Sequence, residues 1–194
     1  MDIQYYPVDW TTYHNLSQKL SATILSHSSK IDQIVAIARG GLTFGHLLSD
    51  LLRIPVATFT IQSFTDIQKQ GEVTITEPLK SPIMGKHILL VDDVADSGVT
   101  IKRALSYLKR FKPKKISTVT MFFKPHSVYR PDYFAKQVPN ARWIIFPYET
   151  TETILSITKS MEKNGVSKAT IQQKLMSLGY TTDQIKFVRR YYLS

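Results

Sequence analysis

The chain has 194 residues, 43% of them hydrophobic and 21% charged, which fits one domain with a substantial core and an appendage. It contains no cysteine, so disulfides, thiolate zinc sites, iron–sulfur clusters and cysteine nucleophiles are excluded. No apolar run approaches the ~18–20 residues that span a bilayer, and the first residues do not read as a signal peptide. We therefore expect a cytoplasmic protein with no membrane partner.

The charge balance is basic, with 25 Lys and Arg against 15 Asp and Glu, a formal net charge of +10. Such a balance favours anionic partners such as phosphorylated small molecules or nucleic acid. The basic residues gather between 102 and 115, where no acid occurs, and again between 150 and 194. Because no RNP-type aromatic motif or zinc-finger spacing accompanies them, we interpret them as solvated surface and expect no nucleic-acid partner.

Hydrophobic spacing predicts helices and strands that alternate along most of the chain. In chain order we expect a helix over 9–29, a strand over 31–38, a helix over 42–53, strands over 56–61 and 87–93, a helix over 99–111, and strands over 115–123 and 143–146. Residues 63–83 are polar and contain one glycine and two prolines, which indicates a hairpin or hood outside the core. Strands that alternate with helices predict an α/β fold with a mostly parallel sheet.

The strand pattern ends near residue 150, and three short helical patterns follow over 150–162, 167–178 and 181–192. We therefore expect a main domain over 1–150 and a helical C-terminal extension over 151–194. This extension either packs on the body or on a partner subunit, or it serves as a protein-interaction module.

The segment richest in chemistry is ILLVDDVADSGVT, residues 88–100. An apolar strand delivers Asp92 and Asp93 to its C-terminal end, where open α/β sheets bind ligands, and Asp96 follows on the loop. The next residues offer hydroxyls and free backbone N–H groups to a phosphate: Ser97, Gly98, Val99 and Thr100. Carboxylates beside such a cradle point to sugar hydroxyls, a divalent cation or a proton to be abstracted. The alternative is an ordinary strand–turn–helix whose acids cap the helix.

This apolar run, acid pair and DSGVT loop resemble the diphosphoribose-binding motif of type I phosphoribosyltransferases. The resemblance implies a five-stranded parallel sheet flanked by helices, with a variable hood. It also implies that Asp92, Asp93 and residues 96–100 bind 5-phosphoribosyl 1-diphosphate (PRPP), with residues 96–100 around the 5-phosphate. Where members of the family often carry a Ser-Tyr pair in the hood, this chain has Ser63-Phe64.

A second match is IARGG, residues 37–41, which resembles the pyrophosphate loop of the same family. The resemblance implies that Arg39 faces the leaving group and that Gly40 and Gly41 let backbone N–H groups approach it. In this family the peptide ahead of the arginine is often cis, so we expect a cis bond between Ala38 and Arg39.

A third match indicates the substrate. FFKP (122–125) and RWIIFPYE (142–149) resemble the base-recognition elements of bacterial and archaeal xanthine–guanine enzymes. The resemblance implies that Lys124 donates to the purine O6 and N7 region and that Trp143 stacks on the ring. Ile144, through its backbone, and Glu149 would read the other edge of the base. The alternatives, with each residue taken alone, are that Lys124 is an exposed loop lysine and that Trp143 is a core aromatic residue.

The resemblance implies a Mg²⁺-dependent purine salvage enzyme that transfers the phosphoribosyl group from PRPP to guanine, xanthine or hypoxanthine. Asp96 would be the general base, Arg39 would stabilise the departing pyrophosphate, and Asp93 with Asp92 would hold the metal. It also implies a homo-oligomer, with a dimer favoured. The alternative is a PRPP-sensing regulator that binds nucleic acid through its basic surface.

Three histidines near these motifs, His46, His87 and His126, lack metal-ligand spacing. We expect them in packing or surface positions.

Overall fold

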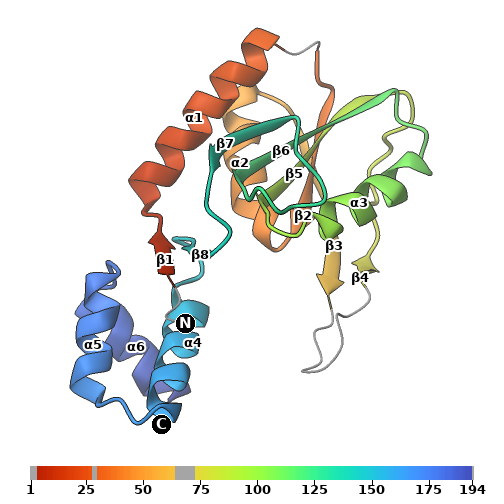
Figure 1. Ribbon diagram of the computed structural model, residues 1–194. Coiled ribbons are helices and arrows are strands. Elements are labelled where there is room, and N and C mark those ends of the chain that lie inside the picture. Colours follow the sequence, from red (N-terminus) through yellow and green to blue (C-terminus); the bar gives the residue numbers. More distant parts are fainter. Residues whose placement is uncertain (1–3, 28–29, 64–72, 194) are drawn as a thin grey trace. The chain divides into compact units, whose positions relative to one another are not determined.

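A computed structural model of the chain describes residues 4–27, 30–63 and 73–193 (Figure 1). The chain divides into two compact units. The smaller unit consists of two segments, Met1–Tyr13 and Ala141–Ser194, and the larger unit comprises His14–Asn140. Helix α1 (Trp10–His27) begins in the smaller unit and continues into the larger.

The larger unit is built on a sheet whose described strands run in the order β4-β3-β2-β5-β6-β7. These are β2 (Gln33–Ala38), β3 (Val56–Ser63), β4 (Val73–Glu77), β5 (His87–Ala95), β6 (Lys115–Phe123) and β7 (Tyr133–Gln137). All neighbouring pairs are parallel except β3 and β4. The predicted α/β fold is therefore confirmed, with five parallel strands and an antiparallel edge. Strand β7 was not predicted.

Helices cover both faces of this sheet. Helix α3 (Val99–Lys109) buries Ile101, Ala104 and Leu108 in one core with Ile37 of β2 and Leu90 of β5. Helix α2 (Gly40–Leu52) packs closely against Ala36, whose side chain points to the opposite face because successive strand residues alternate. A Cβ at Gly45 would lie 2.7 Å from the Ala36 Cβ, so glycine is needed for this approach.

The strand order reverses between β2 and β5. From β2 the chain passes to β3 on one side, and later to β5 on the other side. Ligands of open α/β sheets bind at such a reversal, beyond the C-terminal ends of the strands. Here those ends carry Arg39, directly after β2, and the acidic stretch 92–96 at the end of β5. The topology therefore brings together two motifs that lie about fifty residues apart in the sequence.

The predicted hood is described only at its base. Strands β3 and β4 form an antiparallel pair, with Thr60 opposite Glu77 and Ser63 opposite Val73. This pairing agrees with the predicted hairpin. Residues 64–72, which include Phe64, lie outside the described residues.

The smaller unit combines a short sheet with three helices. Strand β1 (Gln4–Pro7) pairs in parallel with β8 (Arg142–Ile145), and the helices are α4 (Thr150–Lys163), α5 (Lys168–Ser177) and α6 (Thr182–Tyr192). The three helices lie where the sequence predicted them. Ile145 shares a buried core with Ile154, Leu175 and Val188 of the helices. The end of the expected main domain thus packs with the extension, and the functional division at residue 150 stays a prediction.

Candidate active site

The two loops at the strand reversal lie in direct contact. A Cβ at Gly40 would overlap the Asp93 carboxylate, and a Cβ at Gly41 would lie 2.6 Å from the Val91 carbonyl oxygen. Only glycine lets the first turn of α2 approach the end of β5 this closely. Gly40 and Gly41, which the sequence assigned to a pyrophosphate loop, therefore lie against the predicted metal ligand.

Arg39 stands at the start of α2. The peptide bond between Ala38 and Arg39 is cis, as expected. Arg39 is exposed, and it occupies the N-cap position without a side-chain cap hydrogen bond. The positive end of the α2 dipole and the Arg39 guanidinium thus lie at the same edge of the sheet, which suits an anionic ligand.

The acid pair has two different environments. Asp92 is buried, with 8% of its surface exposed, whereas Asp93 is half-buried. Burial raises the pKa of Asp92 well above its ordinary value, and the nearby charge of Asp93 raises it further. Each carboxylate accepts a hydrogen bond from the next backbone N–H, that of Asp93 at 3.1 Å and that of Val94 at 2.6 Å. Asp93 is therefore the carboxylate better placed to meet a ligand.

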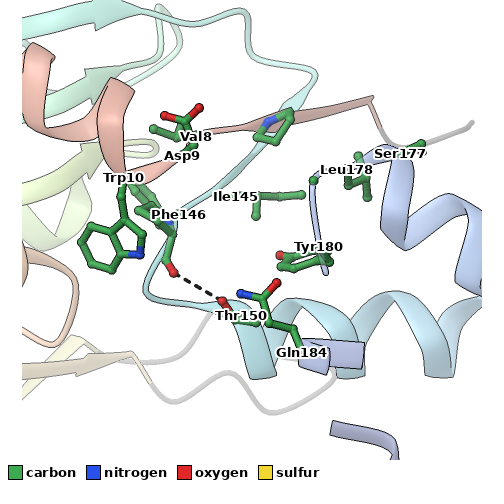
Figure 2. Close-up of a pocket in the computed structure, with 13 residues that line it drawn as sticks. Val8, Asp9, Trp10, Ile145, Phe146, Thr150, Ser177, Leu178, Tyr180 and Gln184 are labelled. Atoms are coloured by element: carbon green, nitrogen blue, oxygen red, sulfur yellow. Dashed lines mark hydrogen bonds between the residues drawn. The ribbon is translucent and has the colours of Figure 1, made fainter. Parts of the chain in front are cut away.

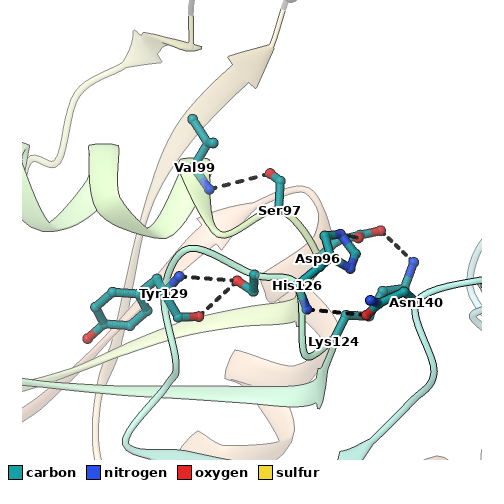
Figure 3. A network of polar contacts seen from close by, with 8 residues as sticks. Asp96, Ser97, Val99, Lys124, His126, Tyr129 and Asn140 are labelled. Atoms are coloured by element: carbon teal, nitrogen blue, oxygen red, sulfur yellow. Dashed lines mark hydrogen bonds and ion pairs between the residues drawn. The ribbon is translucent and has the colours of Figure 1, made fainter.

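The loop from Ser97 to Thr100 begins α3 without an acidic cap. Gly98 is the N-cap residue, with φ of +79° and no side-chain cap hydrogen bond. Ser97 Oγ accepts a 3.4 Å hydrogen bond from the Val99 N–H (Figure 3), and Thr100 is half-buried on the first helical turn. Since no acid caps α3, the ordinary-cap alternative does not fit, and the helix start suits a phosphate.

Asp96 has a basic side chain close to each of its carboxylate oxygens (Figure 3). Lys124 Nζ lies 2.7 Å from Oδ2, and His126 Nε2 lies 3.0 Å from Oδ1. The Lys124 side chain is 7% exposed and that of Asp96 47%. Lys124 is therefore not the exposed loop lysine of the alternative. The predicted general base and the predicted purine donor form one ion pair.

The other predicted purine-binding residues belong to the smaller unit. Trp143 on β8 is 59% exposed, which does not fit the alternative of a core aromatic residue. Ile144 is buried, and its strand neighbour is Tyr6 of β1. Glu149 is half-buried, and its carbonyl accepts a 2.9 Å hydrogen bond from the Thr153 N–H at the start of α4.

The smaller unit also contains a cavity of about 360 Å³ (Figure 2). Its walls come from the end of β1, the start of α1, the β8–α4 turn and the α5–α6 turn, and include Trp10, Ile145 and Tyr180. Trp143, Ile144 and Glu149 do not line it. We therefore assign this cavity no part in recognition of the base.

The described residues contain no cluster of three or more His, Asp or Glu side chains that would hold a metal by themselves. A magnesium ion at a phosphate site needs only one or two carboxylates, because water and substrate oxygens complete its shell. Asp93, with Asp92 beside it, fits that limited requirement.

Within the described ranges, no helix has the length and apolarity to span a membrane.

His126 lies at the surface, which agrees with the expectation, but sequence reasoning missed its contact with Asp96. It contacts Asp96, and its backbone N–H donates to Asn140 Oδ1 at 3.2 Å. The other two histidines differ from it. His87 is buried and contacts the Lys30 carbonyl and Ser117 Oγ, whereas His46 is exposed on α2.

Comparisons with known proteins agree on one family. A family model described as the phosphoribosyl transferase domain matches residues 9–153. The chain is 30% identical over 154 residues to the xanthine-guanine phosphoribosyltransferase of Gluconobacter oxydans, covering 76% of this chain and 86% of that protein. It is 30% identical over 146 residues to the enzyme of the same name from Desulfotalea psychrophila, covering 75% and 86%. The solved purine phosphoribosyltransferase of Pyrococcus horikoshii matches with a TM-score of 0.67 and 27% identity, covering 74% and 93%.

Proposed function

The chain belongs to the phosphoribosyltransferase family, and we propose that it transfers the 5-phosphoribosyl group from PRPP to a 6-oxopurine, releasing pyrophosphate. The observation that carries this proposal is the ion pair between Lys124 and Asp96. It joins a donor suited to a purine carbonyl to a carboxylate suited to accept a purine proton, beside a phosphate-binding loop. The names of the relatives, two of them xanthine-guanine enzymes, support the same substrate class.

PRPP would bind along the reversal point of the sheet. The 5-phosphate would accept hydrogen bonds from the backbone and hydroxyls of residues 97–100 at the start of α3. Its pyrophosphate would meet Arg39 and the backbone of Gly40 and Gly41. The starts of α3 and α2 support this assignment, because neither N-cap residue makes a side-chain cap hydrogen bond and the positive end of each helix dipole favours an anion.

In the reaction, purine N9 attacks C1 of the ribose while the bond from C1 to the pyrophosphate oxygen breaks. The proton on N7 would pass to Asp96, and the electrons of the broken bond leave with pyrophosphate. Positive charge develops on the ribose and negative charge on the leaving group, so electrostatic stabilisation dominates. Arg39 would stabilise the leaving group. The hood would exclude water, which otherwise hydrolyses the activated sugar.

Asp93, together with Asp92 and the oxygens of PRPP, would hold a magnesium ion. When bound, this ion would neutralise charge on the pyrophosphate. Because Asp93 is half-buried and adjoins Gly40, it lies where both the ribose and the pyrophosphate would approach. Asp92 is buried and its pKa is raised, so it is less suited to direct contact with substrate. It holds the end of β5 by accepting a hydrogen bond from the Asp93 N–H.

Lys124 would select the base. An ammonium group donates only, so it suits the carbonyl of a 6-oxopurine and opposes the amino group of adenine. Trp143 would stack on the ring, the Ile144 backbone and Glu149 would read the other edge, and the exposure of Trp143 supports this. Because PRPP is highly charged and does not cross membranes, the proposed enzyme works in the cytoplasm. A homodimer remains our prediction for the assembly.

The first experiment is a panel of guanine, xanthine, hypoxanthine, adenine and uracil with PRPP and Mg²⁺, followed by pyrophosphate release and nucleotide formation. We expect turnover with at least one 6-oxopurine and none with adenine or uracil. Turnover with adenine would contradict the role of Lys124. If PRPP binds but no base is turned over, the proposed enzymatic activity is contradicted and the PRPP-sensing regulator is favoured. A gel shift with nucleic acid at several salt concentrations would then test the regulator.

A further inference from the structure

His126 holds the Asp96 oxygen that Lys124 does not hold. Lys124 Nζ lies 2.7 Å from Oδ2 and His126 Nε2 lies 3.0 Å from Oδ1, so the carboxylate lies between an ammonium and an imidazole nitrogen. The two side chains reach Asp96 from the same loop, which leaves β6 at Phe123. Asp96 itself follows β5, the strand that pairs with β6 up to the Ala95–Phe123 pair. The contact is thus fixed by the sheet register.

The backbone around His126 is held by its own hydrogen bonds. The His126 N–H donates to Asn140 Oδ1 at 3.2 Å, and the Ser127 N–H donates to the Lys124 carbonyl at 3.0 Å. The His126 side chain, however, is 42% exposed. An imidazole that is this exposed contributes little to the core, so its contact with Asp96 is the feature that needs an explanation.

The proposed function, on which this inference rests, places a second demand on Lys124. When Lys124 donates to the carbonyl of a 6-oxopurine, its contact with Asp96 Oδ2 weakens at the moment when that oxygen must accept the proton from N7. If Lys124 alone held Asp96, the carboxylate would be free to rotate as soon as that contact weakened. Loss of alignment by about 1 Å at a reacting group costs on the order of 100-fold in rate.

We propose that His126 is a positioning residue, which holds Oδ1 of Asp96 while Oδ2 exchanges the Lys124 contact for the purine proton. The proton moves from N7 to Oδ2, the bond from C1 to N9 forms, and the bond from C1 to pyrophosphate breaks. His126 neither gains nor loses a proton in this step. Its contribution is to donate from Nε2–H across the 3.0 Å contact with Oδ1 in the substrate complex, which keeps the carboxylate aligned.

This role requires a donor at one position rather than a positive charge. Imidazole presents an N–H at Nε2 when it is protonated and in one neutral tautomer. The terminal amide of glutamine has similar reach and also donates an N–H, but it carries no charge. Leucine has comparable bulk and no donor. His126→Gln and His126→Leu therefore separate the hydrogen bond from the space that the side chain fills.

The experiment compares wild type, His126→Gln, His126→Leu and the control His46→Leu, which alters an exposed histidine on α2 outside the site. We expect His126→Leu to lower kcat about 10-fold to 100-fold with its 6-oxopurine substrate, with KM for PRPP unchanged. His126→Gln should recover most of that loss, and His46→Leu should behave as wild type. Thermal unfolding of all four proteins should show matching midpoints, since both histidines are exposed.

Two results would overturn the inference while leaving the proposed function intact. One is an active wild type whose kcat His126→Leu does not change. The other is a His126→Gln variant as slow as His126→Leu, which would show that shape and not the hydrogen bond matters. A wild type that turns over no base would overturn both the proposed function and the role of His126.

Discussion

The backbone of Gly40 lies so close to the Asp93 carboxylate that a methyl group at Gly40 would sit 2.6 Å from Asp93 Cγ and 2.9 Å from Oδ1. The start of α2 and the end of β5 therefore form one surface. Real Cβ atoms do not approach carboxylate atoms this closely, so any side chain at Gly40 must move either the carboxylate or the helix. In the proposed reaction, both border the pyrophosphate and the metal.

We expect Gly40→Ala to lower kcat/KM for PRPP on the order of 100-fold, because the displaced Asp93 or helix start no longer matches the substrate. Steady-state kinetics with varied PRPP measure this. Gly85→Ala is the matched control. Unlike Gly40, Gly85 has a positive φ, +70°, and no atoms lie within 4 Å of its added Cβ. It should lose about 1 kcal/mol of stability and keep its activity. Equal activity of both variants would contradict the proposed contact.

Asp96→Asn should lower kcat by about 10²- to 10⁴-fold while leaving PRPP affinity near that of wild type. Asparagine retains an oxygen that can accept from Lys124, but it cannot take a proton. Pre-steady-state turnover and PRPP binding by calorimetry separate the two effects. Asp50→Asn, on the exposed face of α2, is the control. A kcat within a few-fold of wild type would remove Asp96 from the role of general base.

Asp92 should make the folded protein less stable as pH rises. Burial and the charge of Asp93 raise the pKa of Asp92 above the ordinary value of 3.8. Between that value and the raised pKa, the folded state binds a proton that the unfolded state has released. Stability from this group is therefore full below pH 3.8 and falls by about 1.4 kcal/mol per pH unit across the interval. Asp92→Asn keeps the oxygen that accepts from the Asp93 N–H and removes this slope.

We expect the Asp92→Asn variant to gain in unfolding free energy over wild type as pH rises from 4 toward neutrality, measured by urea denaturation without PRPP or Mg²⁺. Asp9 should change the stability in the opposite direction as pH rises, because the hydrogen bond from the Thr12 N–H lowers the pKa of Asp9. Asp9→Ala should thus be less stable than wild type above pH 4, and the difference should shrink on acidification. A pH-independent difference between Asp92→Asn and wild type would refute the first expectation.

Trp143→Ala should raise KM for the purine by about 5- to 150-fold, the equivalent of 1–3 kcal/mol of base stacking, with little change in stability. The side chain is 59% exposed, so its removal leaves no buried cavity. The other tryptophan of the chain, Trp10, is 56% exposed and provides a matched control. If Trp10→Ala and Trp143→Ala raise KM equally, stacking on Trp143 is not the cause.

Much of the larger unit was predictable because its elements are local patterns. The apolar runs of β2, β5 and β6 and the spacing of α2 and α3 are encoded within each segment. Strand β7 was missed because the sequence YFAKQ has only three consecutive apolar residues and no alternating pattern, and all five residues are half-buried or exposed. Strand β1 was missed because it is four residues long and its partner, β8, follows more than 130 residues later.

The site was predictable in its motifs but not in its contacts. The acid pair, the DSG loop and the glycine loop could each be recognised within a few residues. The contact of His126 with Asp96 depends on the β5–β6 register, which places Ala95 beside Phe123. No signal within either segment specifies that register. The single available clue was that Lys124 and His126 immediately follow an apolar strand, as Asp96 does.

The C-terminal helices should support base recognition through the core they share with β8. Leu175 is fully buried in the core that also contains Ile145, and Trp143 and Ile144 lie on the same short strand. Leu175→Ala should cost about 2–5 kcal/mol of stability and, at temperatures near its lowered midpoint, raise KM for the purine before KM for PRPP. Tyr191→Ala, on a 59% exposed residue of α6, is the control. Equal sensitivity of both KM values would instead indicate that the helices stabilise the whole chain without favouring the base-binding strand.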